Sequence, residues 1–333
     1  MSPEAVARHR VRLTVAFAAV YLIWGSTYLG IAFAIQSIPP LLMASARFLL
    51  AGGILYSYAR WRGGARPRPV QWGWAFLLGA MFFLIGNGTV VWVEQRLPSG
   101  LTALVVAMVS VWTVLIEWFR PGGARPTGVV LAGVTLGFLG VALLVLPGQV
   151  GGGHVDSVGV MLLMFSTFAW ALASVLSQHA DLPTSAAVVS GMEMLAGGVL
   201  LLLASVAIGD WGRFDPSGIT LKSGLSFLYL VVFGSLVTFT AFAWLLQVST
   251  PNKVATAGYV NPMVAVALGW AFDGEALSPR SLVASLVIIA SVVLIITGRE
   301  LYGRRPVAAA ASSSARGSAP SLSRYAGRVD GAE

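Results

Sequence analysis

Blocks of about 20 apolar residues alternate along the chain with short segments rich in proline, glycine and arginine. A helix of that length spans the hydrocarbon core of a bilayer, which is roughly 30 Å thick. The connectors between blocks hold the helix breakers. The pattern predicts ten transmembrane helices, over residues 12–34, 40–59, 70–93, 99–119, 127–146, 157–179, 184–208, 221–247, 252–272 and 279–298.

Composition supports an all-α membrane protein. Hydrophobic residues make up 57% of the chain and charged residues 10%, whereas an average soluble domain has about 25% charged residues. Cysteine is absent, which excludes disulfides and cysteine-ligated metals. The +8 formal charge raises the possibility of nucleic-acid binding, but the placement of the charges favours a topological role and no nucleic-acid partner.

Positive charge is concentrated on one side of the predicted membrane. Of the 21 Lys and Arg residues, 16 fall in segments on the side of the N-terminus, 4 fall on the opposite side, and Arg47 lies within a span. Cytoplasmic segments carry such an excess, so we expect both termini, residues 1–11 and 303–333, in the cytoplasm. The C-terminal segment is rich in Ala, Ser, Gly and Arg, which predicts a disordered tail.

The two halves of the chain resemble each other weakly. Residues 51–55 (AGGIL) recur as residues 196–200 (AGGVL), and prolines open spans 4 and 5 and their counterparts 9 and 10. Because each copy holds an odd number of spans, the second copy must insert upside down. We therefore expect two inverted five-helix repeats, over residues 12–147 and 157–299, an architecture common among secondary transporters.

An ordered set of short motifs over residues 12–300 resembles the EamA family of the drug/metabolite transporter superfamily, and most closely its YedA-like bacterial inner-membrane members. The motifs are Trp24-Gly25-Ser26-Thr27-Tyr28, Ala46-Arg47-Phe48, Gly86-Asn87-Gly88 followed by Glu94, Pro98-Ser99-Gly100, Glu193-Met194-Leu195-Ala196, Tyr259-Val260-Asn261-Pro262 and Gly274-Glu275.

The resemblance implies ten helices in two EamA repeats, location in the inner membrane and export of metabolites or toxic compounds. Family members transport amino acids, aromatic compounds, nucleobase-like metabolites and drugs, so the substrate stays open. One departure concerns span 4, where family members usually carry a proline near the position of Ser110. Span 9 keeps Pro262. Whether span 4 has a kink is therefore open.

Charged residues inside spans are candidates for function, because a charge at the bilayer centre costs roughly 2.5–3.5 kcal/mol on insertion scales. Arg47 and Glu193 lie at similar depths in spans 2 and 7, which are repeat equivalents. Glu193 could carry a coupling proton, bind a cationic substrate or make a structural hydrogen bond. Arg47 could pair with Glu94 at the outer end of span 3 and close the outer mouth, or it could be purely structural.

Aromatic and amide side chains complete the expected substrate site. Trp24 and Tyr28 lie on span 1, and Trp170 lies near the middle of span 6, where such rings could line an amphipathic cavity or pack between helices. Asn87 lies between two glycines, and Tyr259 and Asn261 precede a proline that frees a backbone carbonyl. These three residues could bind substrate or pack between helices, and they complete the candidate substrate-binding set.

The sequence predicts a secondary transporter, with small-molecule substrates, the lipid bilayer and a possible coupling proton as partners. The alternative is a non-transporting membrane scaffold or sensor. An enzyme is not expected, since the chain lacks the HExxH, GxSxG and GxxxxGK[ST] motifs, and no cofactor or metal is predicted. A glycine stripe at Gly133, Gly137 and Gly140 permits close helix packing, within the chain or in a homodimer.

Overall fold

The computed structural model describes residues 3–303, except 122, 124, 146–148, 151–152, 155, 250 and 277. This part of the chain is helical apart from one short antiparallel pair, β1 (Gln149–Val150) with β2 (Gly153–His154). Nine of its helical stretches are long and apolar enough to cross a membrane. The protein is therefore an all-α, multi-pass membrane protein. Residues 304–333 of the predicted tail lie outside the described residues.

The helices of the first half follow the predicted spans in order. They are α1 (Pro3–Ala18), the π-helical η1 (Ala19–Ile23), α2 (Trp24–Ala34), α3 (Pro40–Trp61), α4 (Pro69–Gly79), the π-helical η2 (Ala80–Asn87), α5 (Gly88–Val93), α6 (Ser99–Val106), α7 (Val109–Phe119) and α8 (Gly128–Val145).

The second half repeats this order. Its helices are α9 (Ser157–Ser177), α10 (Ala186–Ala207), the short 3₁₀ turns η3 (Asp210–Arg213) and η4 (Pro216–Gly218), α11 (Leu221–Tyr229), the π-helical η5 (Leu230–Val237), α12 (Thr238–Val248), α13 (Pro251–Ala255), α14 (Ala257–Asp273) and α15 (Pro279–Gly303).

The outer ends of the first and last helices differ from the expected spans, since α1 begins at Pro3 rather than residue 12 and α15 continues to Gly303 rather than ending at residue 298. Proline is tolerated in the first turn of a helix, and no glycine or further proline lies between Pro3 and the apolar run. The expected span 127–146 corresponds to α8, whose apolar stretch Gly128–Leu144 is shorter than the nine crossing helices.

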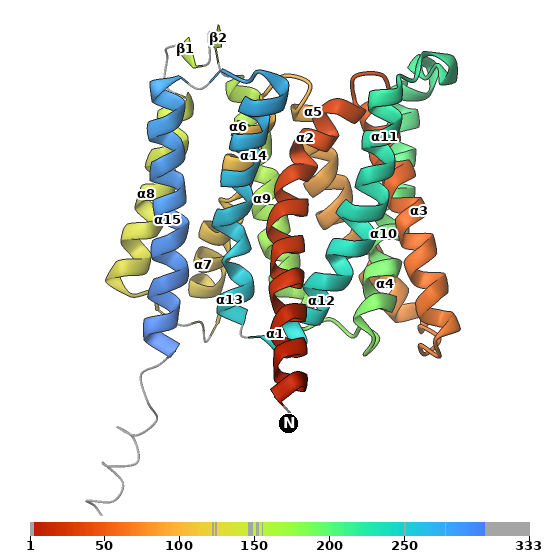
Figure 1. Cartoon of the computed structure of the whole chain (residues 1–333), viewed down its shortest axis with the longest axis horizontal. Coiled ribbons are helices and arrows are strands. Elements are labelled where there is room, and N and C mark those ends of the chain that lie inside the picture. Colours follow the sequence, from red (N-terminus) through yellow and green to blue (C-terminus); the bar gives the residue numbers. More distant parts are fainter. Residues whose placement is uncertain are drawn as a thin grey trace, which may run out of the picture.

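Corresponding helices of the two halves pack against each other. α3 packs on α10, α6 on α14 and α8 on α15, while α2 contacts α11 and α14. In Figure 1 the N-terminus and the end of α15 lie at the same end of the molecule, and α9 begins at the opposite end, beside β1 and β2. There Arg96, which follows α5, lies 3.7 Å from Asp156, the N-cap of α9. The first helices of the two halves thus run in opposite directions.

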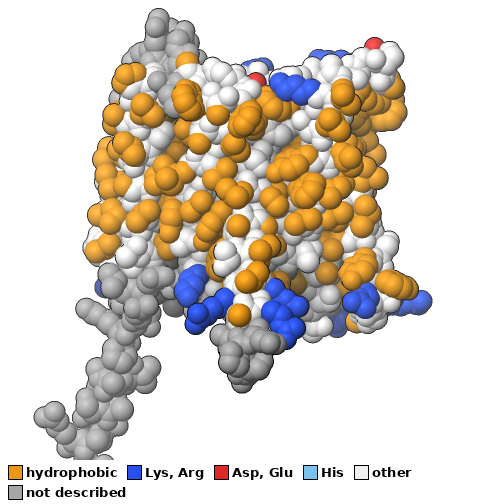
Figure 2. Space-filling view, viewed as in Figure 1, with side chains coloured by type: hydrophobic (Ala, Val, Ile, Leu, Met, Phe, Trp, Pro, Cys, Tyr) orange, Lys and Arg blue, Asp and Glu red, His pale blue; other side chains and the backbone are white. Residues whose placement is uncertain are grey.

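The outer surface separates an apolar band from a basic end. Figure 2 shows hydrophobic side chains around the middle of the molecule and Lys and Arg side chains at both ends, with more of them at the lower end, where Figure 1 places the N-terminus. At that end Arg68 binds Asp181 at 2.6 Å, which connects the segment before α4 to the segment after α9. The predicted charge asymmetry is therefore a property of the folded surface.

The glycine stripe of α8 packs inside the chain. A side chain at Gly133, Gly137 or Gly140 would come within 3 Å of atoms on α15. Ser291 donates a hydrogen bond to the carbonyl oxygen of Gly133 at 2.7 Å, so the two helices approach at backbone distance. The stripe is occupied by an intrachain contact, and homodimer formation stays a prediction.

Replacing Gly52 with leucine should lower the free energy of unfolding by about 1–3 kcal/mol. A Cβ at Gly52 would lie 2.8 Å from Met194 Cβ and 3.0 Å from the Leu195 nitrogen, atoms that belong to α10. The neighbouring Gly53 has no atom within 4 Å of its Cβ position, so Gly53→Leu is the matched control. Thermal unfolding in detergent measures both variants. Equal melting temperatures would contradict this account of the α3–α10 contact.

Candidate functional site

Arg47 lies in the middle of α3 and is only 4% exposed. Its Nε donates a hydrogen bond to Ser235 Oγ at 3.0 Å, the one hydrogen bond that its side chain makes to a described residue. The guanidinium also lies 4.8 Å from the centre of the Phe48 ring. Because Ser235 belongs to η5, Arg47 joins the two halves of the chain inside the membrane. Gly234 leaves room for it, since a Cβ there would lie 3.2 Å from the guanidinium.

Glu94 follows α5 directly and is 8% exposed. Neither of its carboxylate oxygens has a hydrogen-bond partner in the described part of the chain. It interacts electrostatically with Arg47, Tyr28 and Glu275, but no ion pair within 4.0 Å joins Glu94 to Arg47 among the described residues. The two buried charges attract each other without touching.

Glu275 has the partners that Glu94 lacks. Its carboxylate accepts hydrogen bonds from the Ser99 nitrogen and hydroxyl, both at 2.6 Å, and from the Gly100 nitrogen at 3.1 Å. These bonds place its negative charge at the N-terminus of α6, where the helix dipole favours an anion. Glu275 therefore accepts hydrogen bonds from the start of α6. Glu94, in contrast, accepts no hydrogen bond from a described residue.

Two π-helical segments occupy equivalent places in the two halves. Asn87 Nδ2 donates to the carbonyl oxygen of Phe82 at 3.1 Å at the end of η2. Thr238 Oγ1 donates to the carbonyl oxygen of Phe233 at 2.7 Å just after η5. Both side chains reach back five residues, the spacing of π-helix, and such segments recur at functional sites.

Span 4 is interrupted although it lacks the proline that the family resemblance led us to expect. α6 ends at Val106 and α7 begins at Val109. The buried Met108 lies at the break, beside Gly137 of α8. Pro262, in contrast, lies inside the continuous helix α14. Span 4 is therefore interrupted without a proline.

The two candidate tryptophans pack against aromatic rings of other spans. Trp24 lies 5.5 Å from Phe239 and 5.0 Å from Phe242, both on α12. Trp170 lies 5.1 Å from Phe82 on η2. The rings are half-buried. Each tryptophan packs a span of one half against a span of the other.

Three further candidates do not join the Arg47 cluster through any described hydrogen bond. Asn261 Oδ1 is buried without a partner in the described part of the chain, and the Asn261 carbonyl oxygen lies against Gly25. Tyr259 is half-buried among hydrophobic neighbours. Glu193 is half-buried on α10, with no hydrogen bond or ion pair from its side chain to another described residue.

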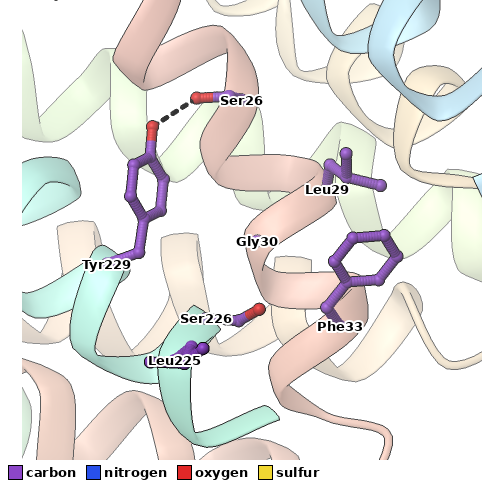
Figure 3. A pocket seen from close by; sticks show the side chains of 7 residues that line it. All are labelled: Ser26, Leu29, Gly30, Phe33, Leu225, Ser226 and Tyr229. Atoms are coloured by element: carbon purple, nitrogen blue, oxygen red, sulfur yellow. Dashed lines mark hydrogen bonds between the residues drawn. The ribbon is translucent and has the colours of Figure 1, made fainter. Parts of the chain in front are cut away.

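A shallow recess of about 280 Å³ opens between α2 and α11. In Figure 3 the side chains of Ser26 and Tyr229 point toward each other across it, and their hydroxyls are 2.6 Å apart. Phe33 lies farther along α2, away from that hydrogen bond (Figure 3). The recess therefore lies along the contact between α2 and α11.

The sequence signature of the EamA-like transporter family matches residues 13–146 and 157–297. The chain belongs to this family. The EamA-like chain is 36% identical over 294 residues to the "Uncharacterized inner membrane transporter YedA" of Escherichia coli K12, covering 87% of this chain and 92% of that one. It is 25% identical to the "Probable amino-acid metabolite efflux pump" of Salmonella typhimurium, with 84% and 93% covered.

A solved structure titled "Crystal structure of protein" shares the fold of this EamA-family chain. The match has a TM-score of 0.58 and 19% sequence identity, and it covers 85% of this chain and 96% of that chain. The family match shows that the protein is a membrane transporter. Its substrate and the roles of its residues are separate questions.

Sequence reasoning missed several partners in the site. Ser235 holds Arg47, and Phe239 and Phe242 surround Trp24. Glu275 was part of a family motif, yet its bond to α6 was not foreseen. Ser235 could have been identified as a candidate because it follows Gly234 directly and lies in the span equivalent to the one that holds Asn87.

Thr238→Val should slow transport by this EamA-family protein more than Thr240→Val does. Both hydroxyls bind backbone carbonyls, but Thr238 reaches five residues back at the end of η5, whereas Thr240 makes an ordinary four-residue bond to Leu236. Losing one such bond costs about 1 kcal/mol. Transport rates in proteoliposomes, normalised to folded protein, measure the difference. Equal transport rates in the two variants would show that the π-helical bond at the end of η5 does not affect transport.

Proposed function

We propose that this protein is a secondary transporter that exports small metabolites or amphipathic compounds, amino-acid-like or aromatic, by alternating access. Its ten transmembrane helices form two inverted five-helix repeats, and both termini lie in the cytoplasm. The packing of equivalent helices on each other and the opposite directions of α1–α2 and α9 support this arrangement. Inverted repeats that meet at the midplane allow one half to move against the other.

The separated charges of Arg47 and Glu94 carry the proposal. Burying an ion without a partner costs several kcal/mol, so a buried carboxylate with two unpaired oxygens favours the binding of a cationic ligand. Arg47 uses Nε for Ser235 and keeps its two terminal nitrogens for a ligand. A zwitterion fits both groups, with its ammonium at Glu94 and its carboxylate on the guanidinium fork.

The same two residues supply a gate. In the absence of substrate, a small approach of α3 to the end of α5 would join Arg47 to Glu94 and close the outer mouth. A bound zwitterion separates the charges and satisfies each of them. The interrupted span 4 and the π-helical segments η2 and η5 are the places where the spans can bend.

The remaining candidates form the walls of the site. Trp24 and Trp170 bring aromatic surface from the first span of each half, and Tyr28 lies near Glu94. Asn87, Tyr259 and Asn261 add polar groups, of which Asn261 Oδ1 is unpaired among described residues. An apolar site with a few polar groups suits the amino acid derivatives suggested by the relative named as an amino-acid metabolite efflux pump.

Glu94→Gln and Arg47→Gln should each lower transport of zwitterionic amino acids at least about tenfold, which corresponds to about 1.4 kcal/mol. Counterflow in proteoliposomes with radiolabelled amino acids measures this. Transport by the wild type should also fall when the amino group is acetylated or the carboxylate is esterified, because each change removes one of the two charges.

Asp273→Asn is the control for this prediction, since it removes an exposed carboxylate at the same end of the molecule. The double variant Arg47→Gln/Glu94→Gln tests whether the two residues act on one substrate, because their effects should then be less than additive. Unchanged transport by the single variants would contradict the zwitterion site.

Glu193 is proposed as the residue that carries a coupling proton. Its carboxyl group is half-buried in α10, at a depth similar to that of Arg47 in α3, and has no described partner. Glu193→Gln should abolish proton-driven export while leaving substrate counterflow, which needs no proton gradient. An unchanged rate and pH dependence in the variant would show that Glu193 does not couple transport to protons.

A further inference from the structure

We propose that the groove between α1 and the η5–α12 segment binds one anionic phospholipid, with an acyl chain in the groove and the phosphate at Arg12. This inference concerns the outer surface of the protein and does not depend on the zwitterion site.

The groove has a volume of about 680 Å³ and an almost entirely apolar lining. Small residues of both helices, such as Ala16 and Ala241, form part of it, and exposed Val15 and Val237 line it as well. The full lining is Val11, Arg12, Val15, Ala16, Ala19, Leu236, Val237, Thr240, Ala241 and Trp244. Such a surface suits a flexible hydrocarbon chain better than a polar solute.

The extent of the groove matches one leaflet of a bilayer. On one side it runs from Val11 of α1 to Ala19 at the start of η1, and on the opposite side from Leu236 to Trp244. Eight residues of helix rise by about 12 Å, while half of the hydrocarbon core is about 15 Å thick. The groove is therefore long enough to hold most of one acyl chain within the leaflet at the basic end.

Charge selects the headgroup. Arg12 is the one charged residue in the lining, and it lies toward the end where the headgroups of that leaflet would be. Arg8 is exposed one turn earlier on the same face of α1, and the His9 ring contacts Trp244 of the groove at 6.3 Å. Figure 2 shows more Lys and Arg side chains at this end than at the opposite end. Basic pockets between transmembrane helices bind anionic lipid headgroups.

The equivalent seam, between α9 of the second half and the η2–α5 segment of the first half, is closed. There α9 packs on η2 and α5, where Val93 and Leu163 are fully buried. A Cβ at Gly159 would lie 3.2 Å from Val93 Cγ1, which leaves no room for an acyl chain. Because a substrate pathway in an inverted repeat would involve both equivalent seams, a groove at only one of them favours a fixed lipid over a moving substrate.

Mass spectrometry of the intact protein released from nanodiscs tests the proposal. Protein from phosphatidylglycerol discs should retain one lipid, and protein from phosphatidylcholine discs should retain far less. Arg12→Gln should lower phosphatidylglycerol retention about fivefold. Arg66→Gln, a change of an exposed arginine at the same end but outside the groove lining, should leave retention unchanged.

A second variant separates the acyl chain from the headgroup. Ala19→Leu fills the groove and should reduce retention of any lipid, whereas Ala142→Leu, on the exposed surface of α8, should not. Equal retention of both lipids by the wild type would overturn the proposal, as would equal loss in Arg12→Gln and Arg66→Gln. A retained second copy of the chain in place of lipid would also overturn it.

Discussion

A charged side chain inside the membrane needs an opposite charge or a hydrogen-bond partner nearby, because an unpaired buried charge is costly. This constraint applies to Arg47 and Glu94. Arg47 meets part of it through Ser235 of the opposite half. Glu94 does not meet it with any described hydrogen bond. We propose that either a bound ligand or a movement that brings Arg47 and Glu94 together satisfies both side chains. Either event is what a transporter needs.

The backbone provides the setting for those charges. Equivalent helices meet in pairs, and glycines such as Gly52 and Gly133 bring them to backbone distance. Rigid pairs at α3–α10 and α8–α15 contrast with the π-helical segments and the broken span 4. Of the irregular segments, η5 contacts the charges directly, because its Ser235 accepts the hydrogen bond from Arg47.

Much of the fold could be predicted from the sequence because apolar length and arginine placement report directly on the bilayer. The middle glycine of the repeated AGG motif has a structural role in both halves, since Gly52 packs against α10 and Gly197 against Gly79 and Phe83. The π-helical segments could not be predicted, because the bonds of Asn87 and Thr238 to carbonyls five residues back leave no mark in hydrophobic periodicity. Likewise, only the folded chain brings Glu275 to the start of α6. The absence of a direct ion pair between Arg47 and Glu94 could not be predicted, because their positions in the sequence do not fix the distance between their helices.

The most direct test of the central claim is the accessibility of Thr102, which is fully buried on α6 with an unpaired hydroxyl among the described residues. The chain has no cysteine, so Thr102→Cys introduces a single thiol that a membrane-impermeant reagent can label. If the protein opens an aqueous path to its interior, the thiol will react from outside in sealed vesicles, and a transported amino acid will slow the reaction. A thiol that stays unreactive in folded protein, with and without amino acids, would contradict the account.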